Sequence, residues 1–497
     1  MLKRMRSFLV LVMLFITVTM SAQVTTATMS GKVTAQDEPI IGATIVAVHE
    51  PSGTRYGTVT NVSGQFNLQG MRTGGLYKVE ISYVGYQTAI YKGINLSLGE
   101  NYVLNVSLKE SSELLDEVVV TASKESNMKS DRAGAIMNAN RDMINSTPTI
   151  SRSISDIMRL SPQGADVGNG FAVGGGNYRQ SFVTVDGAAF NNTFGLGGNL
   201  PANGSPISLD ALEQVTVAVT PFDVRQSGFT GGAINAVTRS GDNQFRGTVY
   251  GYFNNENLRG DRVEDYKLTR SKSQYYTYGA SFGGPIIKDK LFFFVNGEYE
   301  DNVTAGSSYQ PRTSLDQEYT GNVRRPVENT IVDGNETWVG LNDMRQYLKE
   351  KYNYDPGRYN NYSVNTPAYR IMARLDWNAN LNNKLSLRFT KTHTKDSNFP
   401  SSSTSPLSAD DIYPGDTGLG IPKGKDSGRS TKYSMSFENS NYYQVRDFTS
   451  VAGEWNSRFA NGAMNNMLRF AYSYQNEPRE YDGNPFPTVD ILKDGAS

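Results

Sequence analysis

The sequence predicts a mainly β protein: an N-terminal β-sandwich, a small α/β domain, and the N-terminal part of a transmembrane antiparallel β-barrel. Short β runs separated by turn residues occupy residues 29–108, a mixed helix and strand pattern follows over 131–240, and alternating apolar and polar segments recur from Arg246 onward. The mean hydropathy of −0.46 is compatible with a membrane barrel, because alternating strands hide their apolar residues from an average.

Composition excludes several functional classes. The chain has 48 basic and 49 acidic residues, so its net charge of −1 predicts no binding surface for nucleic acid. It has no cysteine and only two histidines, which excludes thiol nucleophiles and thiolate metal sites. Neither paired carboxylates nor a nucleophile with its base can be assembled from the sequence. We therefore expect no metal, no cofactor and no enzyme activity.

Residues 1–22 predict a cleaved secretory signal. Three basic residues precede an uncharged apolar run, Phe8 to Val18, and small residues follow at Ser21 and Ala22. A transmembrane anchor is the alternative, but the run is well short of the roughly 20 residues that span a bilayer. We expect an exported protein, with the cleavage position left open by the large Met20.

Residues 27–110 predict a small β-sandwich. The expected strands are 30–33, 43–48, 56–60, 64–68, 77–83 and 102–108. The stretches "GKVTAQDEPIIGATIVAV", "TVTNVSGQFNLQG" and "VEISYVGYQTAI" resemble the carboxypeptidase-regulatory-like domain that precedes many receptors of the Bacteroidetes type. This resemblance implies a periplasmic adaptor or, by analogy of fold, a carbohydrate-binding module. Peptidase activity is not expected, because the only histidine here, His49, is expected to be a lone surface residue.

Residues 111–123 predict a polar linker that contains a partner-binding segment. Three successive valines favour an extended backbone, which can add as a strand to the edge of another sheet. The segment resembles a TonB box, which implies the inner-membrane TonB complex as a partner, and its residues are Leu115, Asp116, Glu117, Val118, Val119, Val120 and Thr121. The alternative is that Val118 to Thr121 form an ordinary last strand of the sandwich.

Residues 124–241 predict the small α/β domain. A helix capped by Ser153 or Ser155 is expected before Pro162, and Asp186-Gly187 is expected to turn a strand. The stretch from Ile207 to Gly247 strongly resembles the end of the plug of TonB-dependent receptors. The glycine-rich runs of this domain lack the lysine and hydroxyl of a phosphate loop, so we expect plug loops there.

Residues 242–497 predict the first strands of the barrel. Seven segments alternate, and in the clearest Tyr369, Ile371, Ala373, Leu375 and Trp377 share one side while Arg370, Met372, Arg374 and Asp376 share the other. Tight turns at 287–290 and 381–384 alternate with long polar excursions at 301–368 and 396–441, as expected for periplasmic turns and outer loops. These excursions are expected to lack regular structure, except for a helix from Asn342 to Tyr352.

The stretches "GGPIIKDKLFFFVNGEYE", "RSGDNQFRGTVYGYF" and "GNPFPTVDI" resemble the Oar-type branch of TonB-dependent receptors. This resemblance implies a barrel of 22 strands around a plug. Only seven strands are expected here, so the sequence predicts an incomplete barrel, because lipid cannot satisfy an open sheet edge. A soluble β-sandwich or propeller is the alternative, although two long structureless excursions are unusual in such domains.

The expected function is energy-coupled uptake of a large ligand across the outer membrane of a Gram-negative bacterium of the Bacteroidetes type. The sandwich and TonB box are expected in the periplasm, and the barrel in contact with outer-membrane lipid. Siderophore, glycan and peptide remain open as ligands, and so does a surface lipoprotein lid. The alternative is a surface adhesion or structural outer-membrane protein that binds a partner without transport.

One segment of the plug combines aromatic faces with amide and guanidinium donors, a mixture that suits sugars or peptides. The candidate ligand contacts are Tyr178, Arg179, Phe190, Asn191, Asn192 and Phe194. The alternative is that these residues pack the plug against the barrel wall.

Overall fold

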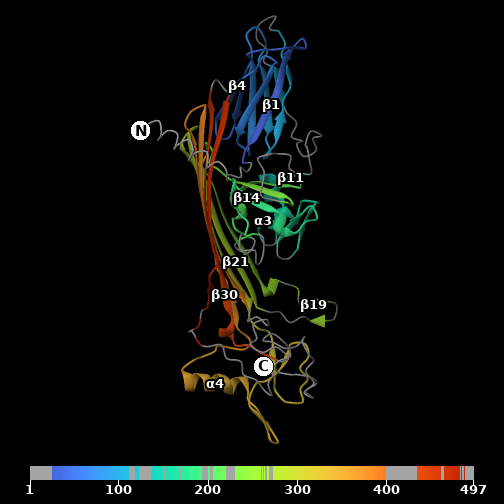
Figure 1. Cartoon of the computed structure of the whole chain (residues 1–497), viewed down its shortest axis with the longest axis vertical. Coiled ribbons are helices and arrows are strands. Elements are labelled where there is room, and N and C mark those ends of the chain that lie inside the picture. Colours follow the sequence, from blue (N-terminus) through green and yellow to red (C-terminus); the bar gives the residue numbers. More distant parts are fainter. Residues whose placement is uncertain are drawn as a thin grey trace, which may run out of the picture.

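The computed structural model describes the following residues: 25–110, 118–121, 136–149, 152–167, 170–192, 200–201, 205–219, 230–258, 260, 262–263, 266–267, 272–398, 434–459, 464–481, 483 and 486. The sandwich lies at one end of the long axis and the α/β domain in the middle, against the long strands of the barrel sheet (Figure 1). Helix α4 lies at the opposite end (Figure 1). The predicted signal, residues 1–22, lies outside the described residues.

The N-terminal part is a sandwich of two sheets. One contains β1 (Ala27–Ala35), β2 (Glu38–Pro39), β5 (Gln65–Met71), β8 (Asn101–Val103) and β9 (Val106–Ser107). The other has the order β10-β7-β6-β3-β4, with β10 (Val118–Thr121), β7 (Ala89–Asn95), β6 (Leu76–Ser82), β3 (Thr44–His49) and β4 (Thr54–Val59). Alternate residues point into the space between the sheets, so Met29, Ile45 and Ile81 are fully buried.

The plug is a mixed five-stranded sheet with short helices. Its order is β11-β16-β17-β14-β15, with β11 (Ile136–Ala139), β16 (Leu212–Ala218), β17 (Ala233–Thr238), β14 (Phe182–Val185) and β15 (Ala188–Ala189). The remaining elements are α2 (Arg141–Ser146), α3 (Ile154–Met158), β12 (Gly164–Asp166), β13 (Phe171–Val173) and the 3-10 turns η2 (Tyr178–Gln180) and η4 (Leu209–Ala211).

Local signals explain two plug elements. Ser153 caps α3 in a capping box with Asp156, so Ser153 and not Ser155 begins the predicted helix. The turn between β14 and β15 places Asp186 at φ 46° and Gly187 at φ 78°, the positive values that a tight hairpin turn requires.

The third part is one long antiparallel sheet in which the main strands pair in chain order. These strands are β18 (Arg246–Asn255), β21 (Ser273–Ile287), β22 (Leu291–Ala305), β28 (Ala368–Asn378), β29 (Asn383–Asn398), β30 (Tyr442–Phe459) and β31 (Met464–Asn476). Short strands β27 (Ser363–Asn365) and β32 (Arg479–Glu480) pair with β22 and β30. The seven predicted barrel segments are thus confirmed, and within the described residues β18 and β31 do not pair, so the sheet is open.

The two faces of β28 differ as its alternation predicts. Ile371 and Leu375 are 47% and 43% exposed, whereas Arg370 and Met372 are buried against the plug. The outward face fits lipid, and the inward face fits a polar lumen filled by the plug. No helix in the described part of the chain is long and apolar enough to span a membrane.

The first long excursion is more ordered than expected. Beyond α4 (Leu341–Tyr352), which is the predicted helix, it contains β23 (Gln310–Arg312), β24 (Val323–Val327), β25 (Ile331–Asp333) and β26 (Glu336–Trp338). Arg312 is buried, donates hydrogen bonds to the carbonyls of Arg325 and Leu315, and lies 5.1 Å from the Trp338 ring. The expectation of irregular backbone was wrong because these contacts of Arg312 order the segment. Such contacts follow no regular spacing in the sequence, so they could not be recognised from it. Other short elements are η5 (Glu256–Leu258), β19 (Arg262–Val263), β20 (Tyr266–Lys267) and η7 (Glu438–Ser440).

Candidate functional site

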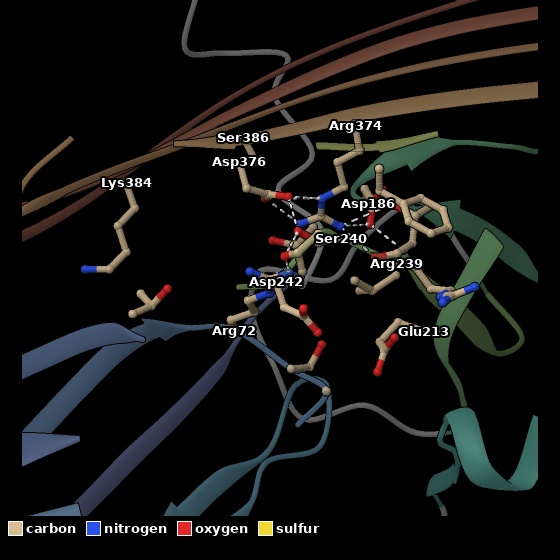
Figure 2. A pocket seen from close by; sticks show the side chains of 18 of the residues that line it. Arg72, Asp186, Glu213, Arg239, Ser240, Asp242, Arg374, Asp376, Lys384 and Ser386 are labelled. Carbon is tan, nitrogen blue, oxygen red and sulfur yellow. Dashed lines mark hydrogen bonds and ion pairs between the residues drawn. The ribbon is translucent and has the colours of Figure 1, made fainter. Parts of the chain in front are cut away.

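A cavity of about 270 Å³ lies where the sandwich, the plug and the barrel sheet meet. Figure 2 shows its charged lining, with Arg72 from the sandwich, Glu213 and Arg239 from the plug, and Arg374 and Lys384 from the barrel strands. The short turns of the sheet lie at this end of the molecule, and such turns face the periplasm in outer-membrane barrels. The cavity therefore lies at the short-turn end of the plug, the end that is expected to face the periplasm.

Two barrel arginines hold the hairpin turn of the plug. Arg388 approaches the Asp186 carboxylate at 3.1 Å, and Arg374 approaches it at 3.6 Å. Arg374 also pairs with Asp376 through two parallel hydrogen bonds of 2.9 Å and donates to the carbonyl of Thr238. The bidentate pair within β28 fixes the orientation of the Arg374 guanidinium. The contacts of Arg374 and Arg388 with Asp186 and Thr238 then hold β14 and β17 against the barrel strands.

A second polar contact lies where the plug meets the first barrel strand. Asp210 pairs with Arg141 at 2.7 Å and with Arg239 at 3.4 Å, and it accepts a hydrogen bond from Thr248. Burial alone raises the pKa of Asp210, but a hydrogen bond from Ser281 and the charge of Arg141 hold it below its usual range. The carboxylate therefore stays ionised and links both plug arginines to the wall.

A third contact lies deeper in the lumen. Arg370 of β28 pairs with Glu298 at 3.1 Å and with Glu300 at 2.9 Å, and donates to the backbone carbonyl of Ser205. Ser208 donates a hydrogen bond to Glu298. Such plug-to-wall contacts can be exchanged for contacts with water, which a dry apolar interface does not allow.

Sequence reasoning missed these contacts. The available signal was the charge on the inward side of β28, where Arg370, Arg374 and Asp376 alternate with apolar residues. It predicts a polar lumen but no partners, because Asp186 and Arg374 are far apart in sequence.

The predicted TonB box is described only at Val118–Thr121, and Leu115, Asp116 and Glu117 lie outside the described residues. Strand β10 pairs in parallel with β7, with Val119 opposite Ile90 and Val120 opposite Tyr91. This pairing agrees with the alternative of a last sandwich strand. Strand β10 ends the sheet, so within the described residues its second edge has no strand partner, and TonB recognition stays a prediction.

The candidate ligand residues occupy two environments. Phe190 is fully buried, 4.6 Å from the ring of Phe448 on β30, and Asn191 accepts from the Val183 amide and donates to the Ser181 carbonyl. The position of Phe190 agrees with a role in packing the plug against the barrel wall, whereas the hydrogen bonds of Asn191 lie within the plug.

The other candidates are more accessible. Arg179 is exposed on η2 and stacks 5.4 Å from the ring of Tyr178, which is partly exposed. Asn192 is partly exposed, and Phe194 lies outside the described residues. Their role in ligand binding stays a prediction.

His49 is not the surface residue that was expected. It is 2% exposed, with Nδ1 2.7 Å from the Ser52 hydroxyl and Nε2 against the Gly74 carbonyl. Burial and then the positive charge of Arg72 lower the pKa of His49 to about 3, so the imidazole is neutral. The expectation failed because the end of β3 is covered by the Gly74 loop, a contact between residues 25 apart. Within the described residues, no group of three His, Cys, Asp or Glu is placed to hold a metal.

Comparison with known proteins identifies the class. Residues 237–490 match the family described as "Outer membrane beta barrel domain", and residues 28–109 match the carboxypeptidase regulatory-like domain. The chain therefore belongs to the outer membrane β-barrel domain family, within the TonB-dependent receptors. Its location is the cell outer membrane.

Individual relatives match at lower identity. The TonB-dependent transporter Oar of Myxococcus xanthus is 25% identical over 300 residues, which cover 58% of this chain and 26% of that protein. The TonB-dependent receptor SusC of Bacteroides thetaiotaomicron is 29% identical over 221 residues, 41% of this chain and 20% of that protein. The chain thus spans about a quarter of the length of these relatives, which are a transporter and a receptor rather than enzymes.

Among solved structures, the outer membrane transporter YddB of Escherichia coli matches with a TM-score of 0.45 and 10% identity. The match covers 70% of this chain and 40% of that one.

Proposed function

We propose that this chain is the plug-bearing part of a transporter that takes up a large ligand across the outer membrane with energy from TonB. One observation supports this proposal above the others. A separate plug sheet lies against the inner face of the barrel strands, held there by polar side-chain contacts such as Arg388 to Asp186. A structural barrel has no need of a plug, whereas a transporter needs one that can be displaced.

The proposed mechanism begins in the periplasm. TonB pairs with the segment Leu115 to Thr121, either at the second edge of β10 or after this strand leaves β7. The inner-membrane complex supplies the force, because the barrel has no energy source of its own. Pulling exchanges the arginine–carboxylate contacts of the plug for water, and the ligand passes between plug and wall.

The ligand class is open among siderophore, glycan and peptide. The names of the matched relatives include SusC and a probable siderophore receptor, PirA of Acinetobacter baumannii, so they do not select one class. Tyr178, Arg179 and Asn192 are the candidate contacts with exposed surface. A lipoprotein lid on the outer loops is a further proposed partner.

The test is deletion of Leu115 to Thr121 from the chromosomal gene, followed by growth on defined iron, glycan and peptide sources. We expect loss of growth on one class of source, with normal surface assembly. The control deletes the seven consecutive residues from Lys124 to Ser130, which follow the TonB box. Normal growth of the TonB-box deletion on every source that requires the intact gene contradicts the proposal.

The alternative function, adhesion without transport, uses no TonB contact. A Val119→Cys variant crosslinked in intact cells separates the two, because the native chain contains no cysteine. Transport predicts a crosslink to TonB, and adhesion predicts none.

A further inference from the structure

The sandwich is docked on the short-turn end of the barrel sheet through one of its loops. The Asn243 amide donates to the Pro51 carbonyl at 3.0 Å, and the Asn378 side chain donates to the Thr54 hydroxyl at 2.9 Å. Gly53 lies so close to the turn between β21 and β22 that a Cβ there lies 2.1 Å from the Asp289 carboxylate. The loop between β3 and β4 therefore sits directly on the first two turns of the rim.

The contact continues along the rim to later strands. Lys384, at the start of β29, lies 4.3 Å from the ring of Tyr56, and Arg458, near the end of β30, donates to the carbonyl of Gly57. Thr25, just before the sandwich, contacts Glu454 and Arg469. The sandwich, together with Thr25, thus contacts the β21–β22 turn and strands β28, β29, β30 and β31 at one end of the sheet.

The sandwich also contacts the plug. Arg72 donates to the Gly241 carbonyl at 3.0 Å, the Leu98 amide donates to the Gln214 side chain at 3.1 Å, and Leu98 packs with Val237. The cavity of Figure 2 lies between these contacts, so its periplasmic side is formed by the sandwich.

The chemistry of the interface suits reversible contact. It consists chiefly of hydrogen bonds, a cation–π contact and Arg and Lys side chains, with a small apolar part at Leu98 and Val237. Groups of this kind regain hydrogen bonds to water when they separate, which lowers the net cost of breaking each contact. The sandwich has its own core, so it can leave the rim as a folded unit.

We propose that the sandwich is a cap on the periplasmic outlet of the barrel, docked at rest and displaced when TonB pulls. The docked state stands on the contacts above, whereas the displacement rests on the proposed transport function. The surface involved is the β3–β4 loop with Arg72, and its partner is the rim of the same chain.

The test uses a disulfide that reports docking. Thr54→Cys with Asn378→Cys joins two residues whose side chains already touch, and Gly53→Cys with Asp289→Cys is a second pair in case the first disturbs folding. Arg55→Cys with Asn378→Cys is the matched control, because neighbouring strand residues point to opposite faces. Intact cells are oxidised, and the linked peptides are measured by mass spectrometry over time.

We expect both designed pairs to link and the control pair to link far less. If neither designed pair forms more linked peptide than the control pair, the docked cap is overturned. With docking established, the linking rate is compared with and without Leu115 to Thr121. Displacement predicts that the disulfide forms several-fold more slowly when the TonB box is intact than when it is deleted. Equal linking rates overturn displacement, provided that deletion of Leu115 to Thr121 in the otherwise native chain abolishes growth. If the deletion alone grows normally, the proposed function fails and the docked cap stands by itself.

Discussion

Arg72 of the sandwich donates its Nη2 hydrogen bond to the carbonyl oxygen of Gly241, 3.0 Å away, at the point where the last plug strand leads into the first barrel strand. Gly241 can lie there because it has no side chain. A Cβ at this position lies 2.3 Å from the Phe293 carbonyl oxygen and 2.7 Å from that of Gly284. One residue thus joins all three parts of the chain.

Gly241→Ala is expected to destabilise the junction by about 1 to 3 kcal/mol, because backbone atoms must move to admit the methyl group. The measurement is protease resistance of the assembled protein in outer-membrane fractions. Gly297→Ala on β22 is the control, since nothing lies within 4 Å of its Cβ site. Equal resistance of the two variants contradicts the close approach at Gly241.

Phe190→Ala is expected to loosen the plug by about 3 to 5 kcal/mol, because it empties a fully buried site beside Phe448. The measurement is the denaturant concentration at which plug peptides lose protection from hydrogen exchange. Phe253→Ala, at a site that is 51% exposed, is the control. A stable plug with weakened ligand binding instead supports the ligand-contact role predicted from the sequence.

Asp210→Asn is expected to cost about 3 kcal/mol, since it leaves Arg141 and Arg239 largely buried without their counter-charge. The plug should then leave the lumen at lower urea concentration, which proteolysis of the assembled protein measures. Asp242→Asn is the matched control, because Asp242 pairs with an Arg246 side chain that is 60% exposed. A urea midpoint that is unchanged at Asp210 contradicts its role as a link between plug and wall.

Acid is expected to destabilise the sandwich through His49. Its pKa is about 3 in the folded state and about 6.5 in the unfolded chain, so the unfolded state binds the extra proton between these values. Stability from the neutral imidazole is complete above about pH 6.5 and is lost as the pH falls toward 3, by a few kcal/mol in all. Hydrogen exchange of sandwich peptides, corrected for intrinsic rates, measures the loss. His49→Gln removes the titration, so a profile as steep as that of the native chain contradicts this assignment.

Local residue patterns were sufficient for most of the main elements, but they missed β7 of the sandwich and the short strands β23 to β26. Period-2 alternation identified all seven long barrel strands and the two faces of β28, and a serine before an apolar helical run located α3. The division of the chain at residues 110, 123 and 241 stays a prediction. These signals are local because the side to which a strand residue points, and the capping of a helix, depend on residues close together in the sequence.

The site depended on contacts that no local pattern contains. Asp186 meets Arg388 across 202 residues, and Thr54 meets Asn378 across 324. The sequence by itself determined which residues form the long barrel strands, which faces of those strands are apolar, and that charges line the lumen. Only the tertiary structure decided which charges pair, that Phe190 and His49 are buried, that β10 lies on β7, and that the sandwich sits on the rim. The reason is physical: periodicity encodes the direction in which a side chain points, whereas its partner is selected by how distant strands pack together.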